Sequence, residues 1–203
     1  AGHLAQSLAI LRDAKPSRVL TIGGDCASDV GSISYLNKLH EGNLAVIWLD
    51  AHADLNTPES SPSSKFHGMP LRLLLGDGAP SLLDQLPSVL AAGQVVFTGL
   101  RELDHAERQY IVDHGLPNVP VCHECSDLLS SVVRRTGRTK VYLHLDLDVI
   151  DPHDFDAVAC PTPGGFGYED LLDSVALLGE ALPIVGCAIT EYQPKGDEDA
   201  RKV

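Results

Sequence analysis

The sequence has few basic residues for its length. It contains 15 Lys and Arg against 28 Asp and Glu, which gives a formal net charge of −13 over 203 residues. Such an acidic surface repels nucleic-acid phosphates and anionic lipid head groups, and no long basic stretch offsets it. We therefore expect neither a nucleic acid nor a membrane surface as partner.

Long apolar runs are also missing. No stretch approaches the roughly 18 to 20 residues that a membrane-spanning helix needs, and no basic segment followed by an apolar one opens the chain. These absences predict a cytoplasmic protein. Apolar residues still make up 44% of the composition, which is enough for one core, so we expect a single domain over residues 1–203.

Cysteines are few and odd in number, and a chain of this length needs no disulfides to fold. The five are Cys26, Cys122, Cys125, Cys160 and Cys187, and we expect them to be free thiols. Cys122 and Cys125 have the spacing of half a structural zinc site. The second pair of ligands that such a site needs is not in the sequence.

Short apolar segments alternate with segments of helical periodicity. Predicted strands cover residues 18–22, 44–49, 94–98, 140–146 and 183–190, and predicted helices cover residues 4–14, 27–40, 69–75, 81–92, 104–114, 125–136 and 168–181. The strand at 44–49 is apolar at every position, which is typical of a parallel strand buried on both faces. The alternation predicts an α/β fold, a doubly wound and mostly parallel sheet with helices on both faces.

Ligands of such sheets bind at the carboxyl ends of the strands, and acidic residues gather there. Asp50, His52 and Asp54 directly follow one strand, while Asp146 and Asp148 end another. Alternate residues of an extended backbone point to one side, so the members of each group should share a face. Helix capping would explain a single Asp, but two groups of neighbouring carboxylates call for cations. Four carboxylates balance two divalent ions, and this ligand set favours Mn²⁺ or Mg²⁺, with Zn²⁺ or Fe²⁺ as alternatives.

Six motifs together carry a family resemblance. They are Gly23-Gly24-Asp25, Asp50-Ala51-His52-Ala53-Asp54, Phe66-His67-Gly68-Met69-Pro70, Gly99-Leu100-Arg101-Glu102-Leu103-Asp104, Asp146-Leu147-Asp148-Val149-Ile150-Asp151-Pro152 and Thr190-Glu191-Tyr192-Gln193-Pro194. In order and spacing the set resembles the ureohydrolases, binuclear manganese enzymes that include arginase and agmatinase, and it is closest to arginase. The resemblance implies a three-layer α/β/α fold, two Mn²⁺ per chain and a homotrimer or homohexamer. Against the family's usual length the chain is short, so we expect segments to be missing at both ends.

The resemblance also implies roles for single residues. The implied metal ligands are Cys26, Asp50, His52, Asp54, Asp146 and Asp148, with Asp50 and Asp146 bridging the two ions. Hydroxide held between the ions would attack the guanidinium carbon of L-arginine and yield L-ornithine and urea. Besides Asp54, the implied catalytic residues are His67, for proton transfer, and Glu191, which would pair with the guanidinium.

The implied substrate contacts favour arginine as the guanidino substrate. Asn56 and Ser63 resemble residues that hold its α-carboxylate, and Asp104 and Glu107 resemble residues that hold its α-amino group. Agmatine lacks that carboxylate and fits less well. Lys65 stands where arginases usually carry Asn, so another ureohydrolase activity, agmatinase or guanidino-acid hydrolase, stays an alternative.

One departure from the family concerns the first metal. Cys26 stands where the family's first motif has His, and a thiolate binds Mn²⁺ less well than Zn²⁺ or Fe²⁺. The first site is therefore expected to be weak, exchanged or empty, and a catalytically weakened arginase homologue is a further alternative. His144 is expected to be a packing residue, and Cys160 a small pocket residue.

Overall fold

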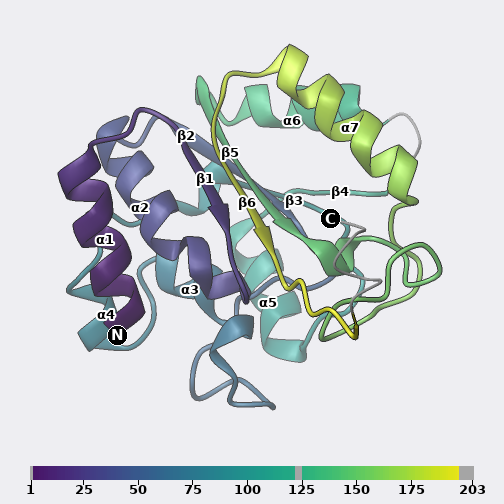
Figure 1. Ribbon diagram of the computed structural model, residues 1–203, viewed down its shortest axis with the longest axis horizontal. Helices are drawn as coiled ribbons and strands as arrows, with labels where there is room; N and C mark the ends of the chain where they lie inside the picture. Colours follow the sequence, from purple (N-terminus) through teal and green to yellow (C-terminus); the bar gives the residue numbers. More distant parts are fainter. Residues whose placement is uncertain (1, 122–124, 197–203) are drawn as a thin grey trace.

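A computed structural model of the chain describes residues 2–121 and 125–196. Within this part of the chain, six strands form one sheet in the order β1-β6-β5-β2-β3-β4, and every neighbouring pair is parallel (Figure 1). The strands are β1 (Val19–Ile22), β2 (Leu44–Leu49), β3 (Val95–Thr98), β4 (Asn118–Val119), β5 (Lys140–Asp146) and β6 (Ile184–Thr190). The predicted parallel α/β sheet is confirmed.

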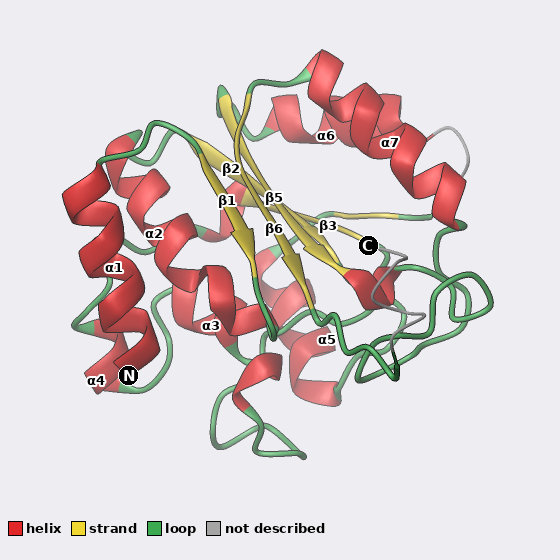
Figure 2. Ribbon diagram, in the orientation of Figure 1, coloured by secondary structure: helices red, strands yellow, loops and turns green. Residues whose placement is uncertain are grey.

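Helices cover both faces of the sheet (Figure 2). One face carries α1 (Gly2–Ala14), α2 (Val30–Leu39), α3 (Pro70–Leu74), α4 (Pro80–Leu83) and α5 (His105–His114), and the other carries α6 (Cys125–Arg135) and α7 (Tyr168–Ala181). Four 3₁₀ helices are η1 (Cys26–Asp29), η2 (Phe66–Gly68), η3 (Ala92–Gln94) and η4 (Leu147–Val149). Among the described residues, no helix is both long enough and apolar enough to cross a membrane.

The core lies on either side of the central strands. Every residue of β2 is buried, and its side chains alternate between the two layers. Trp48 packs with Phe97 and Tyr142 under α2 and α3, whereas Ile47 packs with Leu143 under α6 and α7. This alternation anchors β2 and β5 at the centre of the sheet and so fixes where their carboxyl ends meet.

Strand β1 lies at an edge of the sheet. Its side chains alternate between half-buried and exposed, and Leu20 and Ile22 keep 64% and 76% of their surface exposed. Within the described residues, β6 is its one partner strand. The edge strand ends where the loop to Cys26 begins, so it brings that residue to the rim of the sheet.

Two segments differ from the sequence prediction. The helix expected over 81–92 ends at Leu83, because side chains of α2 bind the backbone that follows: Ser34 Oγ donates to the carbonyl of Ser88 and Asn37 Nδ2 to that of Val89. The two-residue strand β4 was not predicted, since so short an edge strand carries no periodicity.

The structure describes three of the five cysteine side chains. Cys26, Cys160 and Cys187 are free thiols, as expected. The pair considered as half a zinc site, Cys122 and Cys125, lies outside the residues whose side chains the structure describes.

Candidate metal centre

The candidate site lies at the carboxyl ends of four strands. Cys26 follows β1, Asp50 follows β2, Asp146 ends β5 and Glu191 follows β6. Cys26, Asp146 and Glu191 line a cavity of about 210 Å³, smaller than the roughly 300 to 1,000 Å³ of drug-sized pockets. Asp50 is fully buried, with a potential ligand atom within 4.8 Å of Cys26 Sγ. The cavity walls include nearly all the site residues expected from the sequence: Cys26, His52, Asp54, Asn56, Ser63, His67, Asp104, Glu107, Asp146, Asp148 and Glu191.

The two acidic groups are shaped by tight turns rather than by the extended backbone that we expected. Asp50 Oδ1 accepts a hydrogen bond of 2.7 Å from the backbone N–H of His52, which bends the chain directly after β2. Asp54 has a left-handed backbone with φ of 54°. In the same way, Asp146 Oδ1 accepts from the N–H of Asp148 at 2.7 Å and begins η4. The groups do converge, but by local side-chain capping.

His52 lies between carboxylates of both groups. Its Nδ1 is 3.1 Å from Asp148 Oδ2 and 3.4 Å from Asp50 Oδ1, and one ligand atom of each residue lies within 4.8 Å of the others. Burial opposes the charge on His52, but its hydrogen bonds to Asp148 and Asp50 outweigh burial and raise its pKa to about 12. A divalent cation can take the place of that proton.

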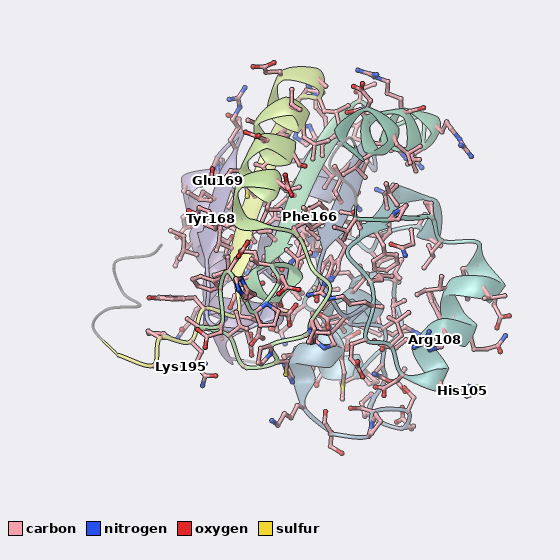
Figure 3. All side chains as sticks on the ribbon, turned by 90° about the vertical axis from the view of Figure 1, so that its right-hand side faces the viewer. His105, Arg108, Phe166, Tyr168, Glu169 and Lys195 are labelled. Carbon is pink, nitrogen blue, oxygen red and sulfur yellow. The ribbon has the colours of Figure 1, made fainter. Side chains whose placement is uncertain are left out.

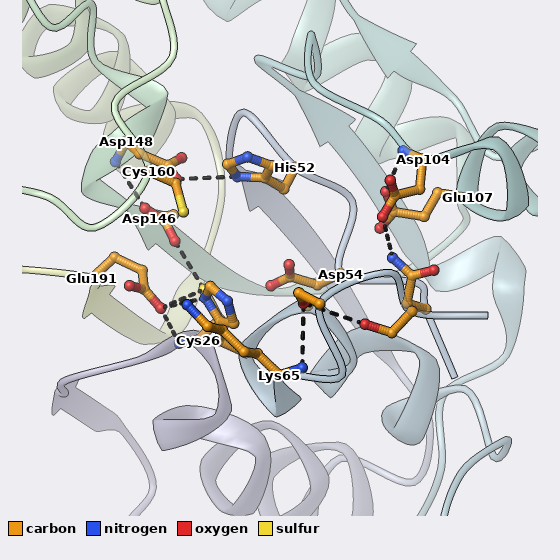
Figure 4. A pocket seen from close by; sticks show the side chains of 15 residues that line it. Cys26, His52, Asp54, Lys65, Asp104, Glu107, Asp146, Asp148, Cys160 and Glu191 are labelled. Carbon is orange, nitrogen blue, oxygen red and sulfur yellow. Dashed lines mark hydrogen bonds and ion pairs between the residues drawn. The ribbon is translucent and has the colours of Figure 1, made fainter. Parts of the chain in front are cut away.

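Cys26 belongs to a second set of ligand atoms. Its Sγ lies 2.8 Å from Asp146 Oδ2 and 3.5 Å from Glu191 Oε1 (Figure 4). Potential ligand atoms of Cys26, Asp50, Asp54 and His144 also lie within 4.8 Å of one another. Burial and then the surrounding carboxylates raise the pKa of the Cys26 thiol well above its usual value, so without a cation the sulfur keeps its proton.

The acids are poorly compensated by the protein alone. Burial, followed by the charge of Asp148, raises the pKa of Asp50 to about 6, and burial with the charge of Asp50 raises those of Asp54 and Asp146 well above their usual range. Among the described residues, Asp54 Oδ2 and His144 Nε2 are buried with no hydrogen-bond partner. Ligand atoms within 4.8 Å of one another match an ion with bonds of about 2.0 to 2.3 Å. The residues therefore fit a pair of divalent cations.

His67 and Glu191 meet at the mouth of this cluster. His67 Nδ1 lies 3.4 Å from Glu191 Oε1, and this contact raises the pKa of the half-buried imidazole. Glu191 has a left-handed backbone with φ of 60°, and its N–H donates to the carbonyl of Gly24 at 2.8 Å. The strained backbone aims a carboxylate into the cavity at the end of β6.

The far wall of the cavity carries the residues expected to bind the substrate's tail, and Figure 4 shows Asp104 and Glu107 across the pocket from Glu191. Asn56 Nδ2 donates to Asp104 Oδ2 at 2.8 Å. Glu107 is buried, and its two oxygens accept the N–H groups of Leu55 (3.0 Å) and Asp104 (2.9 Å). Glu107 thus also fixes the loop that follows the first acidic group.

Glu107 lies on the buried side of α5, whereas His105 and Arg108 nearby are exposed. Both of these side chains project outward from this helix (Figure 3). Ser63 lines the cavity too, and its Oγ accepts the N–H of Lys65 at 3.2 Å within the loop. Lys65 also borders the pocket, so a cation is present where the substrate's tail would lie.

Two residues near the site were not predicted to belong to it. Arg101 ties three segments together through the carbonyls of Asp148 (2.6 Å), Thr162 (2.7 Å) and Gly99 (2.9 Å). His144 is fully buried and faces the acids, with Nε2 3.9 Å from Asp50 Oδ2. Strand parity could have found it, because His144 lies two residues before Asp146 and so shares its face.

The chain is similar to known proteins of one family. The family model described as "Arginase family" matches residues 4–202. The chain belongs to the arginase family. An arginase of Staphylococcus aureus (strain MRSA252) is 35% identical over 187 residues, covering 89% of this chain and 62% of that protein. The arginase of Bacillus subtilis (strain 168) is 38% identical over 183 residues, covering 86% and 61%.

Solved arginase structures share the fold. That of Entamoeba histolytica arginase in complex with L-ornithine superimposes with a TM-score of 0.85 at 29% identity, covering 96% of this chain and 68% of that one. Bacillus subtilis arginase gives a TM-score of 0.83 at 33% identity, covering 97% and 71%. The chain thus spans about 62% of the length of its curated arginase relatives.

Proposed function

We propose that this arginase-family chain is a metal-dependent amidinohydrolase that hydrolyses the guanidinium of L-arginine to L-ornithine and urea. The observation that carries the proposal is the composition of the cavity wall, where Glu191 and His67 lie beside five further potential metal ligands: Cys26, His52, Asp54, Asp146 and Asp148. The relatives' names and the L-ornithine in the Entamoeba structure support arginine as substrate. Two Mn²⁺ per chain are proposed, with Zn²⁺ or Fe²⁺ as alternatives.

In the proposed reaction, side chains of the protein hold the metal ions that activate water. When bound, a pair of divalent ions lowers the pKa of a water molecule and so supplies a nucleophile at neutral pH. The six side chains that would hold the ions are Cys26, Asp50, His52, Asp54, Asp146 and Asp148. Asp50 has potential ligand atoms near Cys26 and Asp54 and also near His52 and Asp148, and Asp146 contacts Cys26 Sγ and the N–H of Asp148, so each of these two carboxylates could help to hold both ions.

Glu191 and His67 act on the substrate itself. The buried Glu191 carboxylate accepts two guanidinium N–H groups side by side, a geometry that orients the planar cation. Its contact with Glu191 raises the pKa of His67 and so favours the protonated imidazole, which can donate its proton to the amine nitrogen as the C–N bond breaks. Asn56, Ser63, Asp104 and Glu107 would hold the amino-acid end of arginine at the opposite wall.

The cellular setting follows from the same proposal. We place the protein in the cytoplasm, as one arginase-like domain that assembles into a trimer or hexamer, as is typical of the family. Neither nucleic acid nor membrane is proposed as a partner. The small guanidino substrate carries positive charge, which the acidic cavity wall attracts.

Urea release tests the proposal directly. With Mn²⁺ added, arginine should be hydrolysed with a kcat/KM at least about tenfold above that of agmatine, because charged hydrogen bonds to the α-carboxylate contribute about 1.5 to 3 kcal/mol. Guanidinobutyrate serves as the third substrate. Faster hydrolysis of agmatine or guanidinobutyrate would replace arginine in the proposal, and no urea from any of the three would refute it.

The tail-binding wall can be tested separately. Asn56→Ala should reduce the preference for arginine over agmatine by about tenfold, mainly through KM, since one polar contact to the substrate's tail is lost. Asn43→Ala is the matched control, because Asn43 bonds Thr139 ahead of β2, at the other end of the strand. An unchanged substrate preference in Asn56→Ala would remove Asn56 from the proposed binding set.

A second candidate is a catalytically weakened family member, and the Cys26 contact favours it. The neutral thiol donates to Asp146 at 2.8 Å and thereby occupies a carboxylate oxygen that an ion would need. Metal content separates the candidates: about two ions per chain supports the hydrolase, and one or none supports the weakened homologue.

A further inference from the structure

The imidazole of His144 is held rigidly at the edge of the acid cluster. Its ring is fully buried in β5 and stacks on Trp48, with ring centroids 3.5 Å apart and an interplanar angle of 7°. Its Nδ1 lies 3.0 Å from Oδ2 of Asp29, which is also fully buried, at the end of η1. The stacked ring and the carboxylate together fix both the position and the rotation of the imidazole.

The other ring nitrogen has no partner. Among the described residues, Nε2 of His144 is buried without a hydrogen bond, and Oδ2 of Asp54 is in the same condition. Potential ligand atoms of His144, Cys26, Asp50 and Asp54 lie within 4.8 Å of one another, and the nearest carboxylate oxygen, Asp50 Oδ2, is 3.9 Å from Nε2. Unpaired buried polar atoms that converge in this way are typical of a site that binds a cation.

We propose that His144 Nε2 is a ligand of the first metal ion, which it binds together with Cys26, Asp50 and Asp54, and that Asp29 is its positioning residue. A carboxylate that accepts the Nδ1–H of an imidazole leaves a lone pair on Nε2 for the metal, an arrangement common in metal sites. The inference rests on the metal centre of the proposed function, but it adds a ligand that the family's motifs do not supply.

The added imidazole explains how a site with a cysteine can still hold an ion. The family's first motif has a histidine where this chain has Cys26, and His144 of β5 supplies an imidazole within 4.8 Å of the ligand atoms of Cys26, Asp50 and Asp54. A ligand set that contains both a thiolate and an imidazole suits Zn²⁺ better than Mn²⁺. The first ion of this chain is therefore expected to be Zn²⁺ when both metals are offered at equal concentration.

A crystal structure of the wild-type protein loaded with Zn²⁺ tests the geometry without any substitution. Anomalous scattering should place a zinc ion about 2.0 to 2.1 Å from His144 Nε2. A zinc ion held instead by Cys26, Asp146 and Glu191, whose ligand atoms form a neighbouring group, would overturn the proposal. So would an absence of bound zinc, which would also count against the metal centre itself.

Binding measurements with Zn²⁺ separate ligation from packing. His144→Gln should weaken the first Zn²⁺ by at least about tenfold, and Asp29→Asn, which keeps the imidazole, by about 10- to 100-fold. His105→Gln, an exposed histidine on α5, is the matched control. Affinity is read by chelator competition and by the rise in Tm on adding Zn²⁺, with circular dichroism to verify folding.

A merely structural histidine predicts a different pattern. The Tm of the metal-free variants would fall while the Zn²⁺ affinity and the Zn²⁺-induced rise in Tm stayed at wild-type values, and that result would overturn the proposal. If His144→Gln does not fold, Asp29→Asn and the wild-type crystal structure decide. Wild-type Zn²⁺ binding in the variants together with urea release would refute the role of His144 and leave the proposed function standing.

Discussion

Asp146→Asn is expected to lower kcat/KM for urea release by at least about a thousandfold, because the activation of water by two metal ions lowers the activation barrier by several kcal/mol. Asp146 is buried at the end of β5, where one carboxylate oxygen meets Cys26 and the other meets the N–H of Asp148. A neutral amide keeps the second contact but is a far weaker ligand. Bound divalent ions, measured by mass spectrometry, should fall from two to at most one per chain.

The same substitution should stabilise the metal-free protein. Burial and the charges of Asp50 and Asp148 raise the pKa of Asp146, so its ionised form opposes folding, and removal of one charge should raise the free energy of unfolding by about 1 to 3 kcal/mol. Urea denaturation with a chelator at pH 8 measures this. Asp113→Asn, an exposed carboxylate on α5, is the control and should change neither quantity. A less stable metal-free Asp146→Asn protein, or one that keeps its activity, contradicts the assignment.

Metal-free protein should lose stability as the pH rises from 5 to 8. The pKa of Asp50 is about 6 in the folded chain against 3.8 for the free side chain. The stabilisation that its protonation contributes is therefore complete below pH 3.8 and is lost as the pH rises through 6. From pH 5 to 8 this costs about 1 kcal/mol from Asp50 alone. Asp54 and Asp146, whose pKa values burial also raises, add to the loss. His52, with its pKa raised to about 12, acts in the same direction above pH 6.5.

Divalent ions should reverse this trend. Metal binding needs the deprotonated ligands, so affinity rises over the same pH range, and an ion at one hundred times its Kd adds about 2.7 kcal/mol per site. Thermal unfolding at pH 5, 6, 7 and 8, with chelator or with Zn²⁺, should show the two stability curves moving apart. Parallel curves would mean that the acid cluster does not hold the ions.

The sequence predicts the sheet well because buried parallel strands are continuous apolar segments. Residues 44–49 are apolar throughout, and this segment became the central strand β2. The acidic groups were found for the same reason, since each follows such a strand directly. Their local shape was not predictable from spacing: capping of His52 N–H by Asp50, and the left-handed backbone of Asp54, are decided by side-chain hydrogen bonds.

The contacts of His144 could not be predicted from the sequence. It was expected to be a packing residue, and its stacking on Trp48 is indeed packing. Its contact with Asp29 joins residues 115 positions apart, and no local pattern in the sequence predicts such a pair. Likewise, the helix expected over 81–92 was displaced by buried side chains of α2, a tertiary effect that overrides local preference.

The strand order also dictates when the centre can form during folding. Asp50 and His52 follow β2, and Asp148 follows β5. These two strands pair directly, so this group can assemble before β6 leaves the ribosome. Cys26 follows β1, which among the described strands pairs with β6 alone, and its contact with Glu191 joins residues 165 positions apart. Such long-range parallel pairing is slow. We therefore expect the nascent chain to capture its ions in sequence, with the Cys26 ion arriving last and locking β1 in place.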